Sequence, residues 1–143
     1  MGGFLATFQV LASFFYHYMP ENVWLEPHTY ILDPDQRDPV TGNPLPYSML
    51  PIYRPGDPVT VVPMYLDEVR PGRIIAFNEC LRQILHHLGY GLVPFLHRVV
   101  AVGADEYGWY AVTKGDSLPA NDLCKVREGD LKGIVPLEPK VPR

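Results

Sequence analysis

Residues 95–102 (FLHRVVAV) and 108–113 (GWYAVT) are two β-prone runs, separated by residues 103–107 (GADEY). Branched and aromatic side chains are favoured on a pleated, partly buried strand, and a short segment between two such runs is typical of a hairpin turn. This stretch therefore predicts a β-hairpin in which residues 103–107 form the turn.

Further short β-prone runs lie on both sides of this hairpin, at residues 59–64, 73–77 and 133–136. Proline accounts for 16 of the 143 residues, about twice its usual share, and it interrupts both helix interiors and central strands. One internal helix is predicted over residues 78–88, with Asn78 as its cap and Gly89 after its end. We therefore expect a mainly β, turn-rich domain with one short inserted helix.

The N-terminal third of the chain differs in amino-acid composition from the rest. Residues 1–20 carry no charged side chain, and residues 33–46 are almost all turn formers. The apolar run is open to three interpretations: an element packed on protein, contact with a membrane, or a processed leader. We divide the chain into an N-terminal apolar arm and Pro-rich strap (1–45), a core (46–136) and a C-terminal tail (137–143), and the compartment stays open.

Composition excludes several classes of function. The formal net charge is −4, which does not favour nucleic-acid binding by phosphate neutralisation. Two cysteines, Cys80 and Cys124, allow at most one bridge and cannot form a four-cysteine zinc site, so we expect free buried thiols. The adjacent His86 and His87 would point about 100° apart on a helix. The sequence predicts no metal and no cofactor.

Ser48, between turn residues, is a candidate nucleophile if a base lies within hydrogen-bond reach. The residues alone leave the base open among the histidines at 17, 28, 86, 87 and 97 and four lysines.

The order of short motifs narrows this choice. The motifs are SMLP at 48–51, RPGDPVTV at 54–61, VRPGRIIAF at 69–77, HRVV at 97–100, TKGD at 113–116 and GIV at 133–135. Together they resemble the signal peptidase I family, over about residues 46–136. Repressor-type autoproteases share this fold and part of the pattern. The resemblance implies coiled antiparallel β-sheets and a serine endopeptidase.

The resemblance also implies roles for individual residues. Bacterial signal peptidases place a lysine at the position of His97, whereas the archaeal and endoplasmic-reticulum type places a histidine. Ser48 would attack the scissile carbonyl and His97 would act as general base. Either Asp116 or Asp122 would orient His97, and both stay candidates.

The same resemblance places Met49 and Pro51 in the substrate-binding region. The substrate would be a protein or peptide in extended conformation, bound as an added β-strand and carrying small residues before the cut. An oxyanion hole would use the Ser48 amide and one nearby donor.

A non-enzymatic alternative stays open. Tyr47 stands where the family has a small residue, and Ile52 stands where it has a threonine. The apolar arm, the strap and the inserted helix would suit a subunit of a virion or other assembly that grips neighbouring subunits through residues 1–45. A repressor-like regulator is disfavoured, because the sequence shows no helix-turn-helix segment or basic arm.

Overall fold

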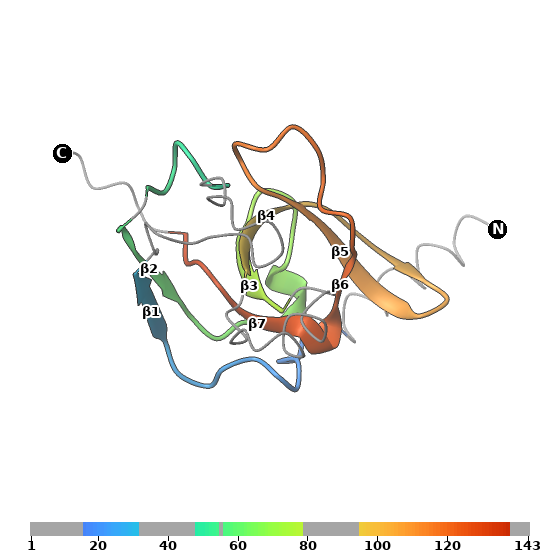
Figure 1. The fold of residues 1–143 in the computed structure, drawn as a ribbon. Coiled ribbons are helices and arrows are strands. Elements are labelled where there is room, and N and C mark those ends of the chain that lie inside the picture. The colour runs from blue at the N-terminus through green and yellow to red at the C-terminus, as the bar shows by residue number, and fades with distance from the viewer. Residues whose placement is uncertain (1–15, 32–47, 55, 79–94, 138–143) are drawn as a thin grey trace, which may run out of the picture.

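A computed structural model describes residues 16–31, 48–54, 56–78 and 95–137. This part of the chain is mainly β, with two antiparallel sheets and two 3₁₀ turns, η1 (Leu66–Glu68) and η2 (Glu128–Asp130). No helix of seven or more residues occurs in these ranges (Figure 1). The predicted mainly β, antiparallel character is confirmed.

The larger sheet has five strands in the order β6-β5-β4-β3-β7. These strands are β3 (Ile74–Phe77), β4 (Phe95–Asp105), β5 (Gly108–Lys114), β6 (Val126–Arg127) and β7 (Leu131–Ile134). Strands β3, β4, β5 and β7 coincide with predicted runs to within a few residues, whereas the two-residue β6 was not predicted.

The central β4–β5 hairpin forms where the sequence predicts it, but its turn is shorter than expected. Pairing continues through Gly103↔Tyr110 to Asp105↔Gly108. A Cβ at position 103 would lie 2.7 Å from the Tyr110 hydroxyl, so the tyrosine ring covers the space that glycine leaves free. Gly108 closes the turn at φ +105°, a conformation that favours glycine. The predicted turn 103–107 is therefore wrong in length.

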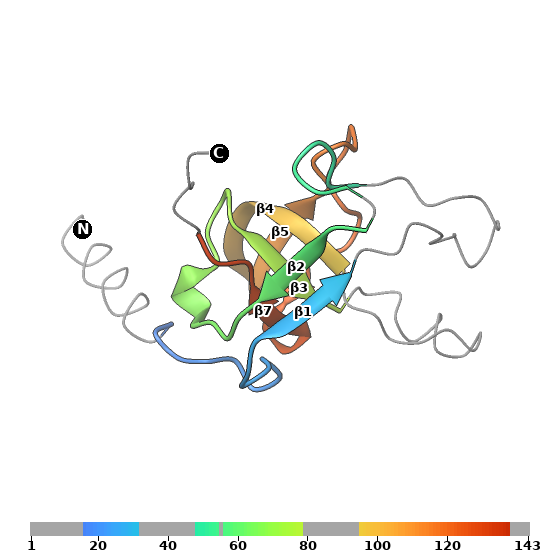
Figure 2. The same cartoon turned by 90° about the vertical axis from the view of Figure 1, so that its left-hand side faces the viewer.

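The smaller sheet pairs β1 (His28–Ile31) with β2 (Pro58–Val61). Figure 2 shows these two strands side by side. Val62 and Ile134 form a bridge with two backbone hydrogen bonds of 2.8 and 3.0 Å, which joins β2 to β7 of the larger sheet. Strand β2 overlaps the predicted run 59–64, and β1 was not predicted.

Apolar side chains from both ends of the described chain form one core. Strand β5 alternates strictly and turns Trp109, Ala111 and Thr113 inward. The core cluster consists of Val23, Met64, Leu66, Val69, Ile75, Phe77, Val99, Trp109, Ala111, Val126, Leu131 and Ile134.

Residues 16–24 of the predicted arm pack on the body of the protein. The Leu66 amide donates to the Tyr18 carbonyl at 2.8 Å, and the Trp24 amide donates to the Lys132 carbonyl at 2.9 Å. Val23 is buried in the core. The segment is thus fastened by backbone hydrogen bonds as well as by apolar contact.

Several predictions lie outside the described residues. They concern the apolar run 1–15, most of the strap 33–46, the helix 78–88 beyond Asn78, and the tail after residue 137. Within the described ranges, no helix is long and apolar enough to cross a bilayer.

The expectation of free thiols is wrong for Cys124, which is disulfide-bonded. The chain's other cysteine, Cys80, lies outside the described residues.

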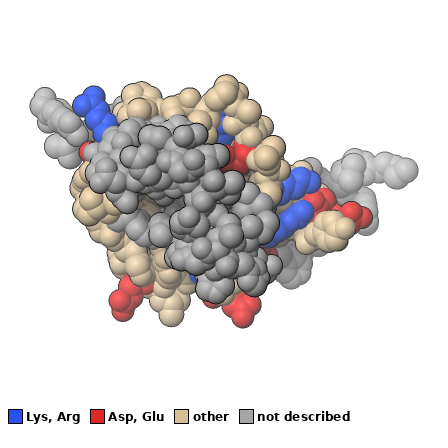
Figure 3. All heavy atoms as spheres, in the orientation of Figure 1, with Lys and Arg blue, Asp and Glu red and all other residues tan. Residues whose placement is uncertain are grey.

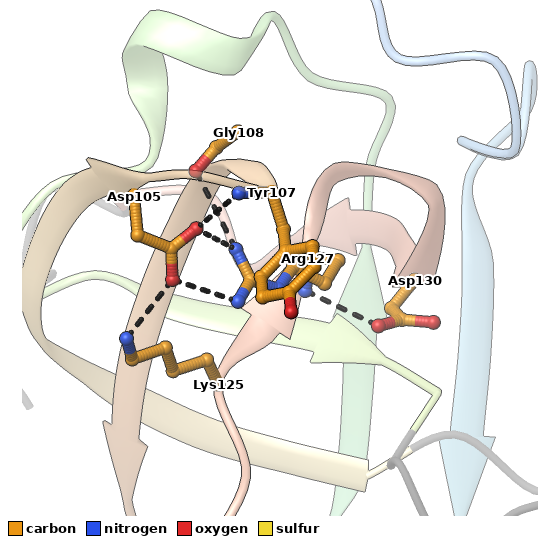
Figure 4. A network of polar contacts seen from close by, with 6 residues as sticks. All are labelled: Asp105, Tyr107, Gly108, Lys125, Arg127 and Asp130. Carbon is orange, nitrogen blue, oxygen red and sulfur yellow. Dashed lines mark hydrogen bonds and ion pairs between the residues drawn. The ribbon is translucent and has the colours of Figure 1, made fainter.

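Charged side chains tie the tip of the hairpin to β6. Acidic and basic groups lie next to one another on this side of the molecule (Figure 3). Asp105 accepts two hydrogen bonds from Arg127, at 2.8 and 2.9 Å, and one from Lys125 at 3.0 Å. Its carboxylate also accepts the Tyr107 amide at 2.9 Å (Figure 4). The pKa of Asp105 lies well below its usual value, mainly because Arg127 donates hydrogen bonds to the carboxylate.

We expect Asp105→Asn to lower the free energy of unfolding at about pH 7, and we expect this loss to become smaller in acid. A carboxylate whose pKa is lowered by folding stabilises the folded state fully above its unfolded pKa of about 3.9, and this contribution is lost as the pH falls toward the folded value. Denaturant unfolding at several pH values should show the gap between the variant and the wild type closing below about pH 4.

The control is Glu106→Gln, which removes one negative charge from an exposed neighbour in the same turn. A gap for Asp105→Asn that stays constant with pH would contradict the assignment.

Candidate active site

Three side chains distant in sequence form a continuous hydrogen-bonded row. His97 Nε2 lies 2.9 Å from Ser48 Oγ, and His97 Nδ1 lies 2.6 Å from Asp122 Oδ2. The two pairs are separated by 49 and 25 residues along the chain. Strand β4 supplies the imidazole, the turn before β2 supplies the hydroxyl, and the segment between β5 and β6 supplies the carboxylate.

The contacts assign the protons of this row. A carboxylate only accepts hydrogen bonds, so Nδ1 of His97 must carry a proton and donate it to Asp122. In a neutral imidazole the other nitrogen is then an acceptor. When His97 is neutral, its Nε2 accepts the Ser48 hydroxyl proton, which is the arrangement that a general base requires.

The surroundings of His97 hold its ring in place. His97 is 8% exposed and is paired with Ile75 across the β3–β4 ladder. The ring of Phe77 makes an edge contact with the imidazole, with centroids 6.3 Å apart and an interplanar angle of 70°. Strand pairing and ring packing together leave the imidazole little freedom to turn away from Ser48.

Asp116, the other candidate for orienting His97, pairs with Arg98 instead. Arg98 donates two hydrogen bonds of 2.8 Å to the Asp116 carboxylate and one of 2.7 Å to the Gly72 carbonyl. This bidentate pair raises the pKa of Arg98 above its usual value. Since consecutive strand residues point to opposite faces, His97 and Arg98 cannot share one carboxylate. The structure thus brings Asp122 to His97 and leaves Asp116 with Arg98.

Ser48 is held by the loop that follows β5. The Ser117 amide donates to the Ser48 carbonyl at 2.8 Å. At position 115, a Cβ atom would lie 2.7 Å from Ser48 Cβ and 2.8 Å from the Ser48 carbonyl oxygen. Only glycine permits this approach, so Gly115 is part of what sets the position of the hydroxyl.

Sequence reasoning gave no role to three residues that support the site: Arg98, Thr113 and Gly115. Thr113 donates to Asp122 Oδ2 at 2.7 Å from a fully buried position on β5. A signal for Thr113 is present in the sequence, since a hydroxyl occupies an inward position of a strand whose other inward residues are Trp109 and Ala111.

The residues predicted to bind substrate differ in exposure. The Met49 side chain is buried at 5% exposure, whereas Pro51 is exposed. Ile52 is also exposed. Tyr47, His86 and His87 lie outside the described residues. Within the described ranges, no group of three metal-binding side chains occurs.

We expect Gly115→Ala to displace Ser48 from His97. An inserted methyl group in a closely packed site costs about 1–3 kcal/mol, and the nearest atoms belong to the Ser48 backbone and Cβ. Thermal unfolding should show a lower midpoint, and the NMR signals of the His97 ring should shift.

The matched control is Gly129→Ala, because a Cβ there would lie 3.8 Å from its nearest neighbour, Asn22 Nδ2. If Gly115→Ala keeps wild-type stability and unchanged His97 signals, the close contact between residue 115 and Ser48 does not require glycine.

Comparison of the chain with known protein families, with curated proteins and with solved structures finds no match.

Proposed function

We propose that the protein is a serine endopeptidase with Ser48 as nucleophile, His97 as general base and Asp122 as the group that orients His97. The observation that carries this proposal is the row of two hydrogen bonds, 2.9 Å from Ser48 to His97 and 2.6 Å from His97 to Asp122. Serine–histidine–aspartate sites of this kind recur on unrelated folds and are recognised by geometry and roles rather than by sequence position.

The chemistry follows from the position of the protons. Ser48 Oγ attacks the carbonyl carbon of a peptide bond while its proton passes to His97 Nε2. The same proton is then given to the departing amine, which breaks the C–N bond and leaves an ester on Ser48. Water then attacks the ester carbonyl carbon while His97 Nε2 accepts its proton. The bond between this carbon and Ser48 Oγ breaks, the acyl part leaves as a carboxylic acid, and His97 returns the proton to Ser48 Oγ. Asp122 stabilises the imidazolium that forms in both steps.

The motif order supports a finer assignment. We propose that the sheets belong to the signal-peptidase type and that the enzyme falls in its serine–histidine branch. A substrate segment would then bind in extended conformation near Met49 and Pro51, with small residues before the cleaved bond. The Ser48 amide would contribute to the oxyanion hole, an interaction worth about 3–4 kcal/mol in other proteases.

A fluorophosphonate probe tests the proposal directly. We expect the wild-type protein to be labelled on Ser48, as located by peptide mass spectrometry, and Ser48→Ala to be unlabelled. Asp122→Asn should slow labelling strongly, by up to roughly 10⁴-fold, because the amide favours the wrong tautomer of His97. Asp67→Asn makes the same chemical change at a residue that contacts His17 and should label at the wild-type rate.

Failure to label Ser48 with both a small and a large fluorophosphonate, in a protein shown to be folded, would contradict the proposal. That result would favour the non-enzymatic assembly subunit, and sizing under native conditions would then look for self-association.

A further inference from the structure

We infer that Thr113 is a positioning residue of this site, whose hydroxyl holds the Asp122 carboxylate in the orientation that receives His97. The inference deepens the proposed function and rests on it for its catalytic meaning. The contact itself is a feature of the fold, so it can also be tested without activity.

Thr113 occupies a buried position whose neighbours on the same face of the sheet are apolar. It is fully buried, and it follows Trp109 and Ala111 on the inward face of β5. Across the ladder it is paired with the buried Val99. A buried hydroxyl is unfavourable unless it is hydrogen-bonded, and Thr113 Oγ1 donates to Asp122 Oδ2 at 2.7 Å. Valine has nearly the same shape, so the hydroxyl is what threonine adds here.

Asp122 needs such a holder because it lies in no regular element. Its amide donates to the Thr113 carbonyl at 2.8 Å, so Thr113 contacts both the backbone and the carboxylate of Asp122. The backbone contact places the Cα atom, but the carboxylate can still turn about its side-chain bonds. The hydroxyl removes that freedom.

Both donors converge on one oxygen atom. Asp122 Oδ2 accepts from His97 Nδ1 at 2.6 Å and from Thr113 Oγ1 at 2.7 Å. Two donors occupy the two lone pairs of this oxygen, so rotation of the carboxylate would break both hydrogen bonds at once. Thr113 thereby keeps the proton of His97 on Nδ1, so that Nε2 faces Ser48 as an acceptor.

Two substitutions separate positioning from packing. Thr113→Val keeps the shape and removes the hydroxyl, whereas Thr113→Ser keeps the hydroxyl and removes a buried methyl group. A positioning role predicts that Thr113→Val slows fluorophosphonate labelling of Ser48 about 10- to 100-fold, the effect of one hydrogen bond to a charged group. It predicts that Thr113→Ser labels within a few-fold of wild type in spite of lower thermal stability. A packing role predicts the reverse order.

A spectroscopic readout makes the test independent of catalysis. The proton on His97 Nδ1 should give a low-field NMR resonance, which Asp122→Asn assigns by shifting it. We expect this resonance in the wild type and in Thr113→Ser, and we expect it to move upfield or to broaden in Thr113→Val. If the wild type is never labelled, the proposed function fails while this comparison still decides the role of Thr113. An unchanged resonance in a folded Thr113→Val protein would overturn the inference.

Discussion

The alternation of side chains along β4 is the constraint on which the site depends. His97 points inward and meets Ser48 and Asp122, whereas Arg98 points the other way and meets Asp116 and the Gly72 carbonyl. Two consecutive residues thus serve two purposes. One carries the imidazole, and the other fastens the loop after β5. A shift of one residue in the register of β4 would exchange the two side chains and disperse the site.

The loop between β5 and β6 contacts both Ser48 and His97. It leaves β5 through Gly115 and Ser117, which contact Ser48, and it returns at Asp122, whose amide bonds to the Thr113 carbonyl. The loop therefore begins and ends against the same strand. This closure places the Ser48 hydroxyl and the Asp122 carboxylate at opposite nitrogens of the His97 imidazole, although neither residue lies on a strand.

Covalent and polar contacts outside the site also restrain the end of this loop. Cys124 is disulfide-bonded two residues after Asp122, and Lys125 and Arg127 are held by Asp105 at the tip of the hairpin. The polar groups of the site are also paired: His97 and Thr113 both bond to Asp122 Oδ2, and His97 bonds to Ser48 as well. A buried polar cluster is stable when its members are all paired, because the cost of removing each from water is then offset.

The sequence alone is enough to predict β2, β3, β4, β5 and β7 to within a few residues, because period and composition act locally. It missed β6, which has only two residues, and β1, which pairs with β2 in the smaller sheet. Motif order pointed to Ser48 and His97. Only the tertiary structure shows that Asp122, and not Asp116, contacts His97. It alone also shows the contacts of Thr113 and Gly115 with the site and the disulfide bond of Cys124. In an irregular loop, the direction of a side chain follows from contacts with distant residues, and no local pattern records it.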